Sequence, residues 1–436
     1  MVVTSPAESR PTPRSLRHNR DFALLWAGQA TSQMGSQMST VAYPLLVLAF
    51  TGSAAQAGIV ASATLISTLV FLLPAGVFAD RLPRKRILVT ASLVQMAAGA
   101  TVVPAVLTHH VYLVHLAAVG VIQGVAGAFY LGASKGAIRR IVDPDQLPAA
   151  MAATQARTRA AIMVGPPAGG ALFSVARFLP FAVDAVSFGM VSLAAALLRK
   201  PLDPGCVPAR EPLRRSITTG IRFVGREPFL RMFAIWAAVL NGAVFGVQLT
   251  VIVLARNRGA NPVEIGTLLS ISASCGLAGA LLATQVIKLA SGRALTLICS
   301  WTFAAASLGM IFVPSIWLIA VLAGLTGFAL MPVNVLLTAR SARITPDHLQ
   351  AQTSNALTLC YSALSAFTPA VFGALTDKFG PYPVIGLATV VYTLLALWLQ
   401  SSRRLHDLDS EPAPATEPAT ATTTGAEPEP AAAPAG

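Results

Sequence analysis

Long apolar stretches separated by short polar segments occupy the chain from residue 22 to residue 400. A helix needs about 20 residues to cross the hydrocarbon core of a bilayer. Twelve stretches are of about that length: residues 22–49, 56–79, 87–107, 111–134, 152–175, 178–198, 229–254, 264–288, 293–313, 315–338, 352–376 and 381–400. The pattern predicts an all-α integral membrane protein with twelve transmembrane helices.

The segments around these stretches divide the chain. The first six helices form an N-terminal half, residues 22–198, and the last six form a C-terminal half, residues 229–400. Residues 1–21 are predicted to be a cytoplasmic N-terminal segment. Residues 401–436 consist largely of Pro, Ala, Thr and Glu. Because such a segment has little apolar surface to bury, we predict a disordered cytoplasmic tail.

A basic cytoplasmic linker, residues 199–228, joins the two halves. Apolar residues recur in it at helical spacing, with arginines between them: Leu213, Ile217, Ile221 and Val224. This spacing predicts an amphipathic helix. Two interpretations stay open, since the helix could lie on the inner leaflet or could serve as an ordered linker without a lipid role.

The two halves carry an internal repeat. Five residues recur 203 positions later: Pro166, Gly170, Ala171, Leu172 and Pro180 return as Pro369, Gly373, Ala374, Leu375 and Pro383. The fifth and eleventh helices are therefore predicted to be copies. This correspondence is expected if two parallel six-helix halves are related by a pseudo-twofold axis along the membrane normal, because the fifth and eleventh helices then occupy equivalent positions.

The composition and charge agree with a membrane protein. Hydrophobic residues make up 54% of the chain and charged residues only 11%, whereas soluble domains carry about 25% charged residues. The net charge of +13 is distributed by side. Of the 31 Lys and Arg, the segments predicted to lie outside hold four: Arg177, Arg256, Arg258 and Lys378. This bias places both termini in the cytoplasm of a bacterial inner membrane and gives no indication of a nucleic-acid partner.

Between the second and third helices lies a dense charge cluster, Gly76-Val-Phe-Ala-Asp-Arg-Leu-Pro-Arg-Lys-Arg86. Its pattern, Gly-x-x-x-Asp-Arg-x-x-Arg-Lys, resembles the signature loop of the major facilitator superfamily of transporters. The resemblance implies twelve helices in two six-helix halves and a cytoplasmic gate in which Asp80 pairs with an arginine and a helix end. The implied gating residues are Gly76, Asp80, Arg81, Arg84 and Lys85. The alternative is a purely topological role for the cations.

The fifth helix contains Gly165-Pro-Pro-Ala-Gly-Gly170, which resembles a Gly-Pro motif of exporters in this superfamily. The chain as a whole resembles the branch that holds enterobactin exporters and macrolide efflux proteins, and the segment Val142-Asp143-Pro144-x-x-Leu147 points the same way. The resemblance implies efflux, with an export-type motif formed by Gly165, Pro166, Gly169 and Gly170. Helix packing alone is the alternative, because small residues let helices approach closely.

Polar residues on apolar helices indicate a cavity. Three glutamines repeat every four residues on the first helix, and amides on a spanning helix avoid lipid. The resemblance implies that the first, fourth, seventh and tenth helices line a central cavity. The candidate residues are Gln29, Gln33, Gln37, Gln123, Tyr130, Trp236, Asn241, Phe245, Gln248 and Asn334. A carboxyl group inside the membrane, Asp184, is a possible proton-coupling site. The family's arginine on the fourth helix is Gly120 here, which is a departure.

These features predict a secondary active transporter, not an enzyme. We expect export of a small amphipathic compound, such as a drug, siderophore or secondary metabolite, by alternating access driven by protons. An antiporter of this kind would confer multidrug resistance. The sequence contains no phosphate-binding loop motif, and the four Cys show no metal-ligand spacing, so no cofactor is expected. We predict a monomer. Two alternatives stay open: a proton-coupled importer of a small solute, and a non-transporting membrane sensor or scaffold.

Overall fold

The computed structural model describes residue 16, residues 19–200, residue 202 and residues 213–402. Five of these are described by their backbone alone: Asp80, Leu213, Arg214, Ser216 and Ile217. Most of the predicted N-terminal segment, part of the linker and nearly all of the predicted tail lie outside the described residues.

The described residues form helices and contain no strand. The first group of helices comprises α1 (Arg20–Thr51), α2 (Ala54–Arg81), α3 (Arg84–Leu107), α4 (Leu113–Ile141), α5 (Leu147–Val175) and α6 (Leu179–Ala196). A second group comprises α8 (Pro228–Asn257), α9 (Pro262–Leu281), α10 (Ala283–Leu289), α11 (Gly292–Phe312), α12 (Ile316–Ile344), α13 (Gln350–Phe379) and α14 (Pro381–Ser401). Helix α7 (Leu213–Arg226) lies between the groups in sequence.

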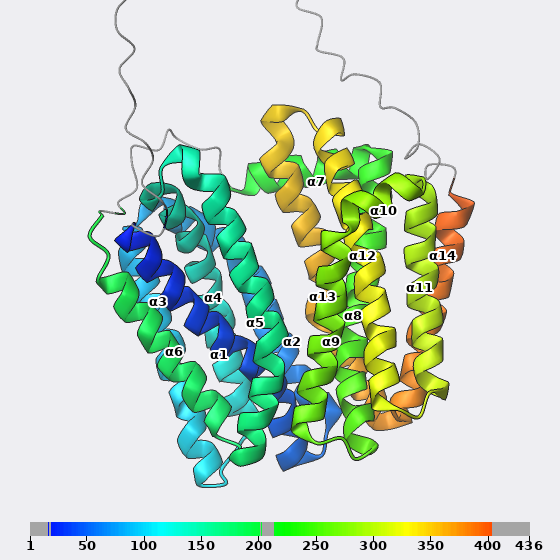
Figure 1. The fold of residues 1–436 in the computed structure, drawn as a ribbon, viewed down its shortest axis with the longest axis horizontal. Helices are drawn as coiled ribbons and strands as arrows, with labels where there is room; N and C mark the ends of the chain where they lie inside the picture. The colour runs from blue at the N-terminus through cyan, green and yellow to red at the C-terminus, as the bar shows by residue number, and fades with distance from the viewer. Residues whose placement is uncertain (1–15, 17–18, 201, 203–212, 403–436) are drawn as a thin grey trace, which may run out of the picture.

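Ten of the described helices are long and apolar enough to cross a membrane. Helices α1 and α5, of 32 and 29 residues, are not among the ten. Polar residues interrupt their apolar stretches, yet both helices run alongside the remaining long helices (Figure 1). The fold is therefore an all-α membrane fold, and the described part of the chain contains twelve helices of spanning length.

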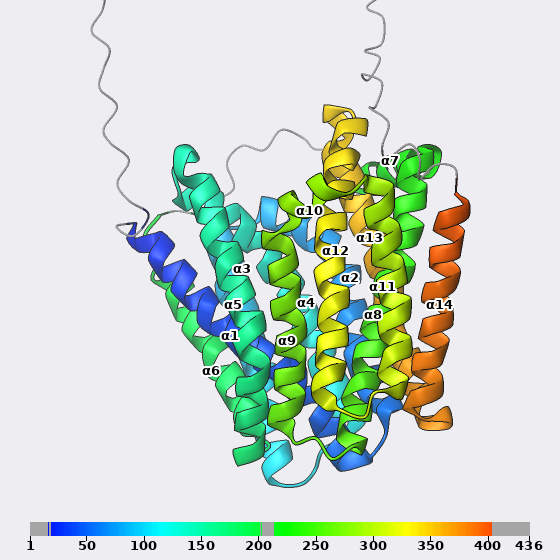
Figure 2. The ribbon, with the colours of Figure 1, turned by 45° about the vertical axis from the view of Figure 1, so that its right-hand side comes forward.

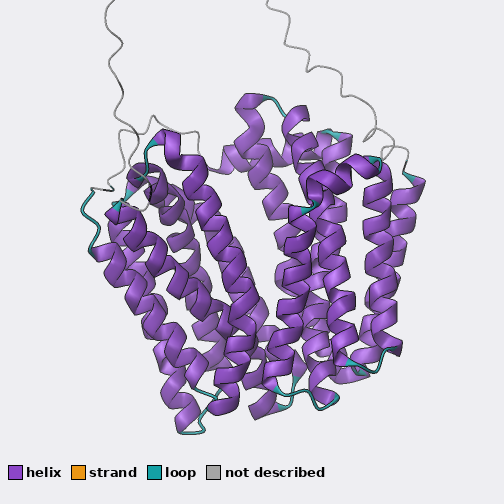
Figure 3. Cartoon of the chain, viewed as in Figure 1, coloured by secondary structure: helices purple, strands orange, loops and turns teal. Residues whose placement is uncertain are grey.

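The two groups of helices lie side by side and lean apart toward one end (Figures 1 and 2). We call α1–α6 the N-half and α8–α14 the C-half. Helix α1 begins and helix α14 ends at the end where the groups diverge, which we call the terminal end. At the opposite, far end the groups converge, and loops in teal join neighbouring helices there (Figure 3). The protein thus has one closed and one spread end.

Glycines bring the two halves into backbone contact toward the far end. A Cβ atom at Gly58 of α2 would lie against the carbonyl oxygen of Pro369 in α13. A Cβ atom at Gly266 of α9 would likewise lie against the carbonyl oxygen of Pro166 in α5. Since Pro369 is the copy of Pro166 in the internal repeat, the two contacts are related as the repeat relates the halves.

Secondary structure follows the same repeat. A 3₁₀ turn precedes α5 at Pro144–Gln146, and another precedes α13 at Asp347–Leu349. The second turn follows the first at the offset of the internal repeat, and each leads directly into its helix. The predicted correspondence of the fifth and eleventh helices therefore extends to the way each helix begins.

Helix α7 packs on the C-half at its terminal end. A Cβ atom at Gly220 would lie against the backbone carbonyl of Gln352 in the first turn of α13. On its other faces, Ile221, Arg222 and Arg226 are exposed. The structure therefore gives the linker helix an ordered packing contact, and its contact with lipid stays a prediction.

Candidate functional site

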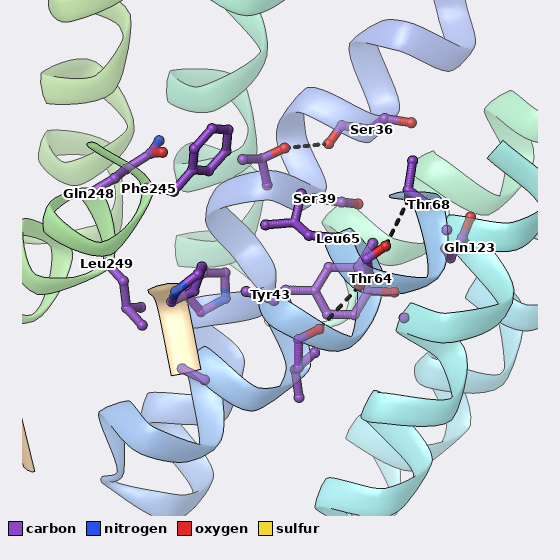
Figure 4. A pocket seen from close by; sticks show the side chains of 18 of the residues that line it. Ser36, Ser39, Tyr43, Thr64, Leu65, Thr68, Gln123, Phe245, Gln248 and Leu249 are labelled. Carbon is purple, nitrogen blue, oxygen red and sulfur yellow. Dashed lines mark hydrogen bonds between the residues drawn. The ribbon is translucent and has the colours of Figure 1, made fainter. Parts of the chain in front are cut away.

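A cavity of about 380 Å³ lies between the halves, within the size range of ligand pockets. Helices α1, α2, α3, α4 and α6 supply most of its wall, and α8 and α13 close it from the C-half. Its polar lining residues are Ser36, Ser39, Thr40, Tyr43, Thr64, Thr68, Gln95, Gln123, Asp184 and Gln248. The labelled side chains come from several helices that face one another (Figure 4).

Asp184 is the acidic residue of this cavity. The side chain is buried on α6, and its Oδ2 accepts a hydrogen bond of 2.8 Å from the Ser39 hydroxyl on α1. Ser36 donates a longer bond of 3.4 Å to Oδ1. Gly35 permits this close approach, because a Cβ atom there would lie 2.9 Å from the Cα of Asp184. Hydroxyl groups, rather than a cation, therefore hold this carboxyl group.

Amides and aromatic rings complete the wall. The Gln123 amide donates to the backbone carbonyl of Gln95 at 3.1 Å, which fixes its side chain beside α3. Phe245 and Gln248 reach the cavity from α8 (Figure 4). Tyr43 packs edge-on against Phe181, with ring centroids 4.9 Å apart. No Lys, Arg or His stands among the lining residues, so the cavity combines one carboxyl group with neutral polar and aromatic surface.

Three of the ten predicted cavity residues, Gln123, Phe245 and Gln248, line this cavity. Two of the others form a polar network within the N-half. Gln29 accepts a 2.7 Å bond from the Arg157 guanidinium and donates to Ser134, while Gln33 accepts a 3.1 Å bond from Thr158. The polar face of α1 is thus directed largely at α5, and polar side chains of the two helices pair with one another.

The remaining predicted cavity residues lie in packed surroundings. Tyr130 has a buried hydroxyl beside this network, and Gln37 contacts Gly165 of α5. Trp236 is buried in the C-half, where its indole N–H donates to Ser300 at 3.1 Å. Asn241 donates to a carbonyl of its own helix. Asn334 on α12 is half-buried and does not line the cavity.

Sequence reasoning missed the contribution of α2. Thr64 and Thr68 line the cavity one helical turn apart, and each hydroxyl donates to a carbonyl one turn earlier in the same helix. Gln95 of α3 was missed as well. The available signal was the spacing of two threonines on a largely apolar helix, since residues four apart share a face.

The four residues of the helix 5 motif face two different partners. Gly165 and Gly169 contact α1 within the N-half, where a Cβ atom at Gly169 would lie 2.7 Å from the Cα of Met38. Pro166 and Gly170 face α9 of the C-half, and a Cβ atom at Gly170 would lie 2.7 Å from the carbonyl carbon of Pro262. One short segment therefore packs both inside a half and between the halves.

The predicted gating motif lies at the terminal end of α2 and α3. The side chain of Asp80 lies outside what the structure describes, Gly76 has open space around its Cα, and Arg81 is exposed. Lys85 donates a 2.8 Å bond to the backbone carbonyl of Leu198 just after α6. Arg84 packs its guanidinium against Gly136 of α4.

Comparison with known proteins gives a consistent family match. The model of the Major Facilitator Superfamily matches residues 25–253 and 237–433. The multidrug efflux pump Tap of Mycolicibacterium fortuitum is 29% identical over 406 residues, covering 90% of this chain and 97% of that protein. Macrolide efflux protein A of Streptococcus pyogenes is 28% identical over 183 residues, covering 41% of this chain and 45% of that protein.

Solved structures show the same fold. A bacterial homologue of the human lysosomal transporter Spinster, in an inward-facing and unoccupied conformation, superposes with a TM-score of 0.72 at 16% identity, covering 91% of this chain and 100% of that one. The nucleoside transporter NupG superposes with a TM-score of 0.71 at 13% identity, covering 89% and 99%.

Proposed function

The chain belongs to the major facilitator superfamily and is a multi-pass membrane transporter, and from this premise we propose that it exports a small amphipathic compound by alternating access. The efflux pumps named above support the direction, since one of them matches nearly the whole chain. The helix 5 motif, which resembles that of exporters, supports it independently.

We place the terminal end in the cytoplasm. The four cations predicted to lie outside, Arg177, Arg256, Arg258 and Lys378, follow or end α5, α8 and α13 at the far end. Most of the remaining cations in the described part of the chain lie toward the terminal end. In this orientation the halves spread toward the cytoplasm and meet toward the outside. The conformation is then inward-facing, so a solute would enter the cavity from the cytoplasm.

The observation that carries the proposal is the cavity shared by both halves. A buried carboxyl group, three aromatic rings and several amides and hydroxyls face a space of drug-like size, without a cation among the lining residues. Such a wall suits an amphipathic solute that is neutral or positively charged, because an anion would meet Asp184 without compensation. The compound itself stays one of three classes: drug, siderophore or secondary metabolite.

We assign proton coupling to Asp184. A carboxyl group within a membrane helix can bind a proton from one side and release it to the other as the cavity changes its access. Ser39 and Ser36 can hydrogen-bond its charged form, while the neutral form places no charge in the cavity. The exchange of protons for solute would drive export by a monomer.

The proposal is tested in an efflux-deficient bacterium that expresses the chain. Accumulation of dyes, macrolides and siderophores is measured with and without a protonophore, for the native chain and for Asp184→Asn. We expect lower accumulation of at least one compound, abolished by the protonophore and by the substitution. The matched control is Asp347→Asn, which neutralises an exposed acid before α13 and should export normally. Higher accumulation would indicate import, and unchanged accumulation of every compound would contradict drug export.

A further inference from the structure

The turn between α1 and α2 at the far end is held by two charged side chains of the opposite half. The Arg256 guanidinium, at the end of α8, donates a 2.8 Å hydrogen bond to the backbone carbonyl of Leu48. Asp377, near the end of α13, accepts bonds of 2.7 Å and 2.9 Å from the backbone amides of Ala54 and Ala55. It also accepts a 2.6 Å bond from the Ser53 hydroxyl.

The two charges match the two helix ends that they touch. Helix α1 ends at this turn and presents carbonyl groups with partial negative charge, whereas α2 begins there and presents amides with partial positive charge. Arg256 meets the first and Asp377 meets the second. Each contact therefore combines a hydrogen bond with a favourable helix-dipole interaction, and both contacts cross from one half to the other.

The other seam between the halves lacks such charges. Ser174 is the repeat equivalent of Asp377, and its hydroxyl donates back to the carbonyl of Gly170 in its own helix. The first turn of α9 is capped from within: Asn261 accepts from the amide of Glu264, and the Glu264 carboxylate accepts from the amide of Asn261. Helix α9 thus carries its own cap, whereas α2 receives part of its cap from the opposite half.

We propose that Asp377 and Arg256 form a latch that keeps the far end closed and must release whenever the far end opens. The contacts join atoms of different halves, so they are lost when α1 and α2 separate from α8 and α13. Loss of these hydrogen bonds opposes release. Because water can hydrate the freed amides and the carboxylate, the net cost is modest and release remains reversible. The latch thereby sets the balance between the two access states, and this role rests on the alternating access proposed above.

The test measures the opening of the far end directly, without substrate or proton gradient. Spin labels are placed at Thr108→Cys and Pro314→Cys, in exposed far-end loops of the N-half and C-half. The full chain, with its native cysteines replaced by alanine, is reconstituted in lipid, and the distance distribution is recorded by double electron–electron resonance. We expect Asp377→Asn to raise the population with the longer distance by roughly threefold to tenfold, the size of a lost helix-cap charge.

Two further variants make the outcome decisive. Arg256→Gln breaks the other contact and should shift the distribution in the same direction, which also covers a failure of Asp377→Asn to fold. Glu264→Gln neutralises a carboxylate at the same end of the molecule that caps α9 within one half, and it should leave the distribution unchanged. A native distribution in both latch variants, or an equal shift in Glu264→Gln, would overturn the latch. A shift without any exported compound would retain the latch and refute the proposed export.

Discussion

The substitution Gly170→Ala should shift the equilibrium between the closed and open far end while changing the stability of the fold little. The added Cβ would overlap the carbonyl oxygen of Pro262 and lie 2.7 Å from the carbonyl carbon and 3.0 Å from the Cα of Val263. All of these atoms are backbone, so no side chain can move away. Helices α5 and α9 would have to separate by about 1 Å to restore ordinary contact. Overpacking of this kind costs about 1–3 kcal/mol.

The adjacent residue provides a matched comparison. Gly169→Ala would meet the Cα of Met38 at 2.7 Å, but α1 belongs to the same half as α5. Its cost therefore falls on every conformation, whereas the cost of Gly170→Ala falls only on the state with a closed far end. Both substitutions gain about the same helix propensity, roughly 1 kcal/mol over glycine, so this term cancels between them.

The expected results differ in kind. Gly170→Ala should raise the far-end-open population by roughly 5-fold to 150-fold, which is 1–3 kcal/mol expressed as an equilibrium constant, with little loss of thermal stability. Gly169→Ala should lower the melting temperature and leave the distance distribution of the Thr108/Pro314 label pair as in the native chain. The reasoning is refuted if both variants give the same pattern, or if Gly170→Ala only lowers stability.

Three further outcomes follow from particular contacts. Trp236→Phe removes the buried bond to Ser300 and should lower stability by about 1–3 kcal/mol, measured by thermal unfolding, while export is retained. Lys85→Met removes the bond to the Leu198 carbonyl and should likewise reduce thermal stability; a shift in the distance distribution would support the predicted gating role of Lys85, and an unchanged distribution would contradict it. Raising the salt concentration should increase far-end opening, because exposed charges are screened, and Asp377→Asn should flatten this dependence in the same distance measurement.

The internal repeat could be predicted from the sequence because the recurring residues include proline and glycine, which few other residues can replace at these positions. Proline and glycine at Pro166 and Gly170 mark positions where helices of the two halves meet through their backbones. A larger residue at such a position is disfavoured in both copies, so the pattern recurs in the second half as Pro369 and Gly373. The membrane fold was equally readable, since long apolar runs have few other solutions.

The identity of polar partners was not accessible in the same way. The glutamines of α1 showed that one face avoids lipid, but a cavity and a polar helix neighbour satisfy that requirement equally well. In the structure Gln29 accepts a hydrogen bond from Arg157, and Gln33 accepts one from Thr158. Both partners are distant in the sequence. Trp236 also satisfies its N–H inside the C-half rather than in the cavity. Periodicity therefore fixes a face, while the choice of partner depends on the packing of distant helices.

The latch formed by Asp377 and Arg256 likewise depends on partners that the sequence does not identify. In sequence Asp377 is a charge at the end of a spanning helix, which indicates only that the helix leaves the membrane. Its role arises because the pseudo-twofold arrangement places it at the start of α2, while the equivalent helix start in α9 is already capped by Asn261 and Glu264. Opening the α5–α9 seam then costs packing alone, whereas opening the α2–α13 seam costs packing and charged hydrogen bonds. On this reasoning the halves would part first along α5 and α9, with α2 and α13 released last.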